Sequence, residues 1–183
     1  MARLIHLNGP PGIGKSTIAR RFVSEHPGVL HCDVDVLRTL IGGWSTDFTA
    51  AGALIRPAAI AMITAYLAGG HDVVLPQLLV DPAELARFEE CAAQTDSLFL
   101  ERVLMDEPES AAARFDRRGD VDADADPWHD QVRAIVAASG GADALRRYHD
   151  GLQDLIKQRP ETIVIPSNDN EIEETYLRFL ATI

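Results

Sequence analysis

Residues 9–16 read GPPGIGKS, between the apolar run Leu4–Leu7 and the amphipathic stretch Lys15–Glu25. The stretch fits the phosphate-binding pattern G-x-x-x-x-G-K-[ST] in full. Its glycines let the backbone curl so that several N–H groups face one anion, and the helix that follows adds the positive end of its dipole. The sequence therefore predicts a strand, a phosphate-binding loop and a helix in direct succession.

The predicted nucleotide site takes in the whole loop, with separate tasks for three side chains. Lys15 can reach the β- and γ-phosphates, Ser16 can offer its hydroxyl to Mg²⁺, and Thr17 is a weaker ligand candidate. ATP and Mg²⁺ are the expected cofactors, and the preference for ATP over GTP stays open. The residues expected to contact the nucleotide are Gly9, Pro10, Pro11, Gly12, Ile13, Gly14, Lys15, Ser16 and Thr17.

Composition limits the class of protein and its partners. The chain has 183 residues, 46% hydrophobic and 25% charged, which suits one globular domain over residues 1–183. A formal charge of −11 argues against nucleic acid or an anionic membrane as the main partner, because both need a basic face. Two distant cysteines indicate a reducing compartment, no apolar run is expected to reach the length of a membrane span, and the first strand leaves no room for a signal peptide. We expect a cytoplasmic protein, and the oligomeric state stays open.

Short apolar runs alternate with stretches of helical spacing, which predicts an α/β fold. In such a fold a parallel sheet of five strands carries helices on both faces, and ligands bind beyond the carboxyl ends of the strands. Capping patterns begin at Asp81, Asp106 and Asn168. The predicted strands are Leu4–Leu7, Val29–Cys32, Val73–Leu75, Leu98–Met105 and Thr162–Ile165. The predicted helices are Lys15–Glu25, about Ile55–Ala68, Pro82–Ala93, Glu107–Arg118, Gln131–Lys157 and Asp169–Thr182.

GTPases, motor ATPases and small-molecule kinases share the phosphate-binding pattern, so other residues must separate them. A motor ATPase usually has an apolar strand that ends in Asp-Glu, but the comparable strand Val73–Leu75 is followed by Pro76 and Gln77. A GTPase needs an Asn-Lys-x-Asp loop, and the nearest match, Asn168-Asp169, lacks the lysine. These departures weaken the interpretation of the chain as a motor ATPase or as a GTPase.

The second predicted strand ends in two carboxylates, Asp33 and Asp35, followed by Arg38. In an extended chain residues two apart point to one face, so both carboxylates would lie beside the phosphate loop. One could hold Mg²⁺ through water, and the other could accept a proton from an attacking hydroxyl. Arg38 could orient an anionic or polar substrate. The alternative is that the two acids are helix caps or surface carboxylates.

At these residues the chain resembles the small P-loop kinases that phosphorylate hydroxyl groups: shikimate and gluconate kinases, chloramphenicol phosphotransferase and the zeta-toxin kinases. In that group an aspartate after the second strand is the catalytic base, which implies this role for Asp35 and the magnesium side for Asp33, with the reverse assignment open. The resemblance covers residues 1–120 and the last strand–helix pair. It implies a P-loop NTPase fold of the nucleoside-kinase kind and transfer of the γ-phosphoryl group of ATP to a hydroxyl of a small molecule. An antibiotic, a nucleoside or nucleotide sugar, and a sugar-like metabolite are the candidate acceptors.

The resemblance also implies a helical lid at about residues 107–140 whose arginines meet the triphosphate. Arg114, Arg117 and Arg118 stand at i, i+3 and i+4 and share one helical face. We favour Arg114 and Arg118 as catalytic and nucleotide-binding residues, against the alternative of a solvated basic face.

The remaining candidates concern the acceptor and the base of the nucleotide. Trp44, Phe48 and Arg56 fall in the segment that caps the acceptor in related kinases, and Gln77 stands where relatives often carry an acidic or other polar substrate group. Asn168 either lies beside the adenine or caps the last helix. The histidines show no spacing that predicts a catalytic role. Two other functions stay open: a regulatory ATPase or switch that acts through a protein partner, and a zeta-like toxin that phosphorylates a nucleotide sugar.

Overall fold

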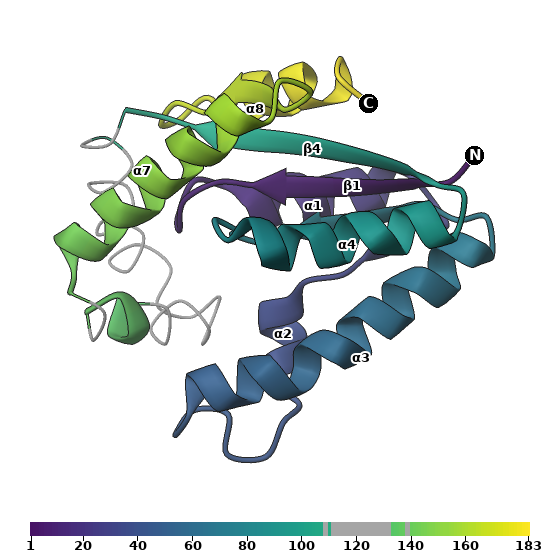
Figure 1. The fold of residues 1–183 in the computed structure, drawn as a ribbon. Coiled ribbons are helices and arrows are strands. Elements are labelled where there is room, and N and C mark those ends of the chain that lie inside the picture. Colours follow the sequence, from purple (N-terminus) through teal and green to yellow (C-terminus); the bar gives the residue numbers. More distant parts are fainter. Residues whose placement is uncertain (108–109, 111–132, 138–139) are drawn as a thin grey trace.

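The computed structural model describes residues 1–107, 110, 133–137 and 140–183 (Figure 1). Its sheet has five strands in the order β2-β3-β1-β4-β5, and every neighbouring pair is parallel. The predicted α/β fold is confirmed, and the strands shift by at most one residue at an end from their predicted bounds. The strands are β1 (Arg3–Asn8), β2 (Leu30–His31), β3 (Val73–Pro76), β4 (Leu98–Met105) and β5 (Ile163–Pro166).

Six helices with defined bounds accompany the sheet in the described part of the chain. They are α1 (Lys15–Glu25), α2 (Val34–Arg38), α3 (Phe48–Ala68), α4 (Pro82–Gln94), α7 (Ala142–Gln158) and α8 (Ile172–Leu180). The bounds of α1 agree with the prediction, and α4 begins at the predicted residue, where the side chain of Asp81 accepts the backbone N–H of Ala83 at 2.9 Å. The short helix α2 was not predicted.

Three helix starts differ from the prediction, each for a local reason. α3 begins at Phe48 rather than near Ile55, because the side chain of Asp47 accepts the backbone N–H of Ala50 at 2.9 Å. α7 begins only after Gly140 and Gly141, whose φ values of 109° and 58° break the long predicted helix.

The last helix, α8, begins at Ile172, and Asn168 does not cap it. The amide of Asn168 instead donates to a carboxylate oxygen of Glu171 at 2.8 Å. The predicted helix Glu107–Arg118 and most of the predicted lid lie outside the described residues.

Helices α3, α4 and α7 cover one face of the sheet. Ile63, Phe88 and Leu155, one from each helix, belong to the same buried cluster as Leu4 of β1. Figure 1 shows α3 and α4 together below the strands. Burial of each large apolar side chain contributes about 1.5–3 kcal/mol, so this cluster fixes the helices firmly on the sheet.

Helices α1 and α8 cover the other face. Phe22 of α1 and Phe179 of α8 pack edge to face with ring centroids 5.4 Å apart, in a cluster with Ile5 and Leu7 of β1. Alternate residues of β1 therefore serve opposite faces, as the period of a strand requires.

The face of β1 toward α3 and α4 changes character along the strand. Leu4 is apolar, but His6 and Asn8, the next two residues on that face, are polar and completely buried. Both lie near the carboxyl end of the strand, where the phosphate loop begins.

Helix α3 corrects one expectation from the sequence. Its 21 residues are long and apolar enough to cross a membrane by length and composition, with a mean hydropathy of 1.5 in the best window. Its inner side, including Ile55, Ala59, Ile63 and Leu67, packs into the core beside the sheet. Of its most apolar window, 28% is buried inside the structure.

Candidate active site

The phosphate loop joins β1 to α1, and its shape depends on glycine at two positions. Gly9 has a φ of 143°, and a Cβ there would lie 2.5 Å from the carbonyl oxygen of Leu104. Gly14 has a φ of 107° and stands at the start of α1. Both values favour glycine strongly, so a side chain at either position would distort the loop.

Lys15 and Ser16 place a cation and a hydroxyl at the mouth of the loop. The ammonium of Lys15 donates to the carbonyl oxygens of Gly9 and Pro10 at 2.8 and 2.9 Å. The hydroxyl of Ser16 donates to a carboxylate oxygen of Asp33 at 3.2 Å. The loop thus carries its own positive charge, and Asp33, in the segment between β2 and α2, supplies an acid to it.

The Ser16–Asp33 pair fits Mg²⁺, because a hydroxyl and a carboxylate are the hard oxygen donors that this ion prefers. In the described part of the chain, no group of three or more His, Cys, Asp and Glu side chains could hold a metal ion. A magnesium ion at this pair would therefore take its other ligands from phosphate oxygens and water, as Mg²⁺ usually does.

Asp33 and Asp35 do not lie in an extended chain, so that part of the prediction is wrong. Asp33 is the N-cap of α2, and one of its carboxylate oxygens accepts the backbone N–H groups of Asp35 and Val36 at 3.1 and 3.3 Å. Asp35 lies in the first turn of α2. The cap turns the chain so that the two carboxylates still lie near each other at the end of β2.

The surroundings of Asp35 perturb the ionisation of its carboxyl group. Burial raises the pKa of Asp35 above its ordinary value of 3.8, and the charge of Asp33 raises it further. Arg38, Lys15 and the side-chain amide of Gln77 lower the pKa and only partly offset burial. A carboxylate with a raised pKa is a stronger proton acceptor than an ordinary surface aspartate.

Arg38 is held rigidly beside this acid. One of its terminal nitrogens lies 3.3 Å from a carboxylate oxygen of Asp35, and its guanidinium stacks on the ring of Phe48, 3.5 Å from the ring centroid. A Cβ on Gly52 would lie 2.8 Å from the guanidinium, so this glycine leaves the space that the group occupies.

Two N–H-bearing nitrogens of Arg38 have no partner. Nε and Nη1 are buried, and neither makes a hydrogen bond to the described residues. A buried donor without a partner costs stability, which marks these groups as suited to a ligand.

Gln77 follows β3 and faces the same acid. Its side-chain amide lowers the pKa of Asp35, and its buried Oε1 atom has no hydrogen-bond partner in the described structure. Asp35, Arg38, Phe48 and Gln77, all predicted substrate residues, are thereby brought together from α2, α3 and the loop after β3.

The sequence of this chain matches a known protein family. The model of the AAA domain family (AAA_33) matches residues 4–138. The chain belongs to the AAA domain family. No curated protein matches its sequence significantly.

Solved structures show that this family member has a P-loop kinase-like fold. A gluconokinase from Sinorhizobium meliloti 1021 is similar with a TM-score of 0.61 and 17% identity, over 97% of this chain and 89% of that one. The tunicamycin resistance protein of Deinococcus radiodurans gives 0.62 and 16%, over 99% and 95%. Deoxyadenosine kinase from M. mycoides gives 0.55 and 11%, over 97% and 96%. At these identities the likeness establishes the fold alone.

The roles of two further predicted residues of this AAA domain, Arg56 and Trp44, are not tested by the structure. Arg56 pairs through Nε with a carboxylate oxygen of Glu84 at 3.2 Å and so links α3 to α4. Trp44 lies half-buried in the segment between α2 and α3. Their contact with a substrate stays a prediction.

At the end of β5, the phosphate loop is contacted by Ser167, the neighbour of the predicted Asn168. The hydroxyl of Ser167 is buried and donates to the carbonyl oxygen of Ile13 at 3.0 Å, so it supports the phosphate loop. Asn168 is exposed, and its side-chain amide is engaged by Glu171 rather than by the loop. Ser167 was not selected from the sequence, since a serine before a helix is too common to stand out. Arg114 and Arg118 lie outside the described residues.

Proposed function

We propose that the protein is an ATP-dependent phosphotransferase that moves the γ-phosphoryl group to a hydroxyl of a small molecule. The observation that carries this proposal is the position of the Asp35 carboxylate, 3.3 Å from the buried guanidinium of Arg38 and near Lys15 of the phosphate loop, where burial raises its pKa. Membership in the AAA domain family and the P-loop kinase-like fold support it.

In this proposal the loop binds the triphosphate through its backbone N–H groups, and Lys15 exchanges its two carbonyl partners for β- and γ-phosphate oxygens. Ser16 and Asp33 would hold Mg²⁺, which neutralises charge on the phosphates when it is bound. Most of the catalytic effect is positioning and electrostatic stabilisation, because phosphoryl transfer asks little covalent chemistry of a protein.

Asp35 is the proposed general base. It accepts the proton of the acceptor hydroxyl as that oxygen attacks the γ-phosphorus, and the β–γ bridging oxygen leaves with ADP. Its raised pKa favours this step, while the charge of Arg38 favours the ionised form. Asp33 is engaged at once by Ser16 and by two backbone N–H groups, so its oxygens are less free to meet an acceptor hydroxyl.

The unpartnered atoms around Asp35 suggest the chemistry of the acceptor. Nε and Nη1 of Arg38 would bind a carboxylate, phosphate or other acceptor oxygen of the substrate, and Oε1 of Gln77 would accept a neighbouring hydroxyl or amine. A polyhydroxylated molecule would satisfy both Arg38 and Gln77 if it carries an anionic or strongly polar group close to the hydroxyl that is phosphorylated. A sugar acid, a nucleoside or nucleotide derivative, and a sugar-containing antibiotic all meet this description.

Several assignments of the proposal depend on sequence alone. Arg114 and Arg118 of the predicted lid would meet the developing charge on the γ-phosphate, and Asn168 would lie beside the adenine. Trp44, Phe48 and Arg56 would close over the acceptor, although Phe48 would act mainly by holding Arg38.

The test is Asp35→Asn in a screen of hydroxylated metabolites and antibiotics for a mass gain of one phosphoryl group. We expect the unmodified protein to phosphorylate at least one compound, and the variant to lose about 10²–10⁴-fold in that rate. Stabilisation of the variant by Mg·ATP against heat should remain. Asp154→Asn, an exposed aspartate on α7, is the matched control.

Two outcomes would contradict the proposal. If Asp35→Asn transfers phosphate at full rate, Asp35 is not the base. If no Mg·ATP or Mg·GTP binding is measurable by calorimetry, the nucleotide function itself is wrong.

A further inference from the structure

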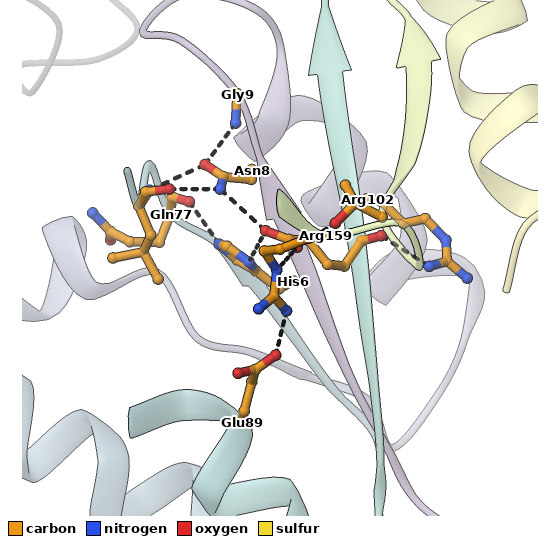
Figure 2. Close-up of polar contacts among 10 residues, drawn as sticks. His6, Asn8, Gly9, Gln77, Glu89, Arg102 and Arg159 are labelled. Carbon is orange, nitrogen blue, oxygen red and sulfur yellow. Dashed lines mark hydrogen bonds and ion pairs between the residues drawn. The ribbon is translucent and has the colours of Figure 1, made fainter. Parts of the chain in front are cut away.

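We propose that His6 and Asn8, two buried side chains of β1, are positioning residues that fix the loop after β3 and so hold Gln77 against Asp35. Figure 2 shows these side chains between the phosphate loop and the loop after β3. The catalytic meaning of the inference rests on the proposed function, but the positioning itself can be tested without any phosphoryl transfer.

Asn8 ties the two loops together. Its Oδ1 atom accepts the backbone N–H of Gly9 at 2.9 Å and that of Leu79 at 3.0 Å, while its Nδ2 donates to the carbonyl oxygen of Leu79 at 2.7 Å. The amide thus pairs with both backbone groups of Leu79 and with the first residue of the phosphate loop. One side chain therefore sets the distance between the two loops.

His6 fixes the same loop two residues earlier. Its Nε2 atom lies 2.9 Å from the carbonyl oxygen of Gln77. A carbonyl only accepts hydrogen bonds, so Nε2 carries the proton and the neutral ring has its lone pair on Nδ1. Burial lowers the pKa of His6 below 6.5, and the charges of Lys15 and Arg159 add to this effect against Glu101 and the carbonyl of Gln77.

Glu101 of β4 completes the arrangement behind His6. Its carboxylate accepts hydrogen bonds from Nε of Arg159 at 2.7 Å and from the hydroxyl of Thr162 at 2.6 Å, and Arg159 also binds Glu89. Burial opposes its ionisation, but the hydrogen bonds from Thr162 and Arg159 outweigh burial and lower the pKa of Glu101. The ionised carboxylate stays 3.8 Å from Nδ1 of His6, too far to hydrogen-bond it.

This arrangement gives His6 one hydrogen bond and one orientation. Nδ1 is buried and has no hydrogen-bond partner among the described residues, and turning the ring over would leave the carbonyl of Gln77 without its donor. With the carbonyl of Gln77 and both backbone groups of Leu79 held, the backbone that carries the Gln77 side chain is fixed, and that side chain lowers the pKa of Asp35. The function of the buried polar network is then to orient a group at the active site.

The experiment follows the side-chain amide of Gln77 by ¹H–¹⁵N NMR in the whole chain without nucleotide. Gln77→Leu identifies the signal by its loss. We expect the amide protons of the unmodified protein to be shifted downfield and protected from exchange, and Asp35→Asn to move them. His6→Leu should shift them toward the values of a free amide, because it removes the donor to the carbonyl of Gln77. His6→Gln should restore them, since its amide can present an N–H near the position of Nε2.

Asn8→Ala reaches the same loop by a second route and should also release the Gln77 amide, which keeps the test usable if His6→Leu does not fold. An unchanged Gln77 signal in a folded His6→Leu or Asn8→Ala variant would overturn the positioning role, as would a His6→Gln variant that behaves like His6→Leu. A Gln77 amide that is shifted as expected in a protein without transferase activity would instead leave the positioning intact and refute the proposed function.

Discussion

The phosphate loop and the proposed acceptor side, which consists of Asp35, Arg38, Phe48 and Gln77, lie next to each other but are built in different ways. The loop of residues 9–17 is one continuous segment whose backbone N–H groups are proposed to bind the phosphates, and glycines set its shape. On the acceptor side, Arg38 and Phe48 come from two helices and Gln77 from a third element. The first region depends on spacing in the sequence, and the second depends on tertiary packing.

The two regions also hold their cations differently. Lys15 donates to carbonyl oxygens of its own loop and remains half-exposed, so it can turn to a phosphate. Arg38 is buried between an acid, an aromatic ring and a glycine, and it cannot move far. Substitutions in the loop should therefore affect every reaction of the nucleotide, whereas those on the acceptor side should affect transfer to the second substrate alone.

Lys15→Ala should have the largest effect and should act on nucleotide turnover of every kind. Loss of the ammonium removes the cation nearest to the β- and γ-phosphates, which we expect to lower ATP turnover by about 10²–10³-fold, whether the acceptor is water or a hydroxyl compound. Steady-state release of ADP measures both reactions. Lys157→Ala, which removes an exposed lysine paired with Asp154, should leave turnover unchanged.

Gly52→Ala should affect the acceptor side alone. The added Cβ would lie 2.8 Å from the guanidinium of Arg38, which is pinned on Phe48 and cannot give way freely. We expect overpacking to cost about 1–3 kcal/mol of unfolding free energy and KM for the acceptor to rise, with the Kd of Mg·ATP unchanged. Gly42→Ala is the matched control, because a Cβ there meets nothing within 4 Å. An equal loss of ATP affinity in Gly52→Ala would show that the two regions are not separate.

The sequence was sufficient to predict the loop because all its parts are local. The order of strand, loop and helix and the bounds of α1 agree with the prediction. The selection of the two aspartates as site residues stays a prediction, and their predicted extended conformation was wrong, since Asp33 caps a helix of only five residues. A helix this short gives no periodic pattern, although an aspartate before it and an arginine in its last turn are typical helix-end signals.

The parts that were missed depend on contacts between distant segments. Gly52 leaves space for the guanidinium of Arg38 only because α3 packs over that residue. Ser167 can bond to the phosphate loop only because β5 lies beside the loop. One feature of the sequence could have pointed to His6 and Asn8: they are polar residues that interrupt the apolar pattern on one face of β1. That interruption indicates a buried polar partner, but the identity of the partner, the loop after β3, follows from the order of the strands.

Ser167→Ala should have a smaller effect, and it tests whether a residue outside the phosphate loop stabilises the loop. Ser167→Ala removes the buried hydrogen bond to the carbonyl oxygen of Ile13, which should cost about 0.5–1.5 kcal/mol of unfolding free energy and weaken Mg·ATP binding modestly. Chemical denaturation and calorimetry measure the two effects. Ser24→Ala is the control, since its hydroxyl donates to the carbonyl of Arg21 on an exposed helix surface. A loop that is built only from its own backbone would respond equally little to both changes.

The smallest effect at neutral pH concerns the buried histidine that joins the two regions. Because burial holds the pKa of His6 below its ordinary value of 6.5, the unfolded chain takes up the proton more readily than the folded one. The free energy of unfolding should thus fall as the pH drops from 6.5 through the lower pKa of the folded state. Gln at this position cannot be protonated, so His6→Gln should lose less stability over that range. Urea unfolding at several pH values compares the slopes, with the exposed His71→Gln as the control. Equal slopes for the unmodified protein and His6→Gln would mean that His6 is protonated without cost, and the ring would then be free to turn away from the loop that it is proposed to hold.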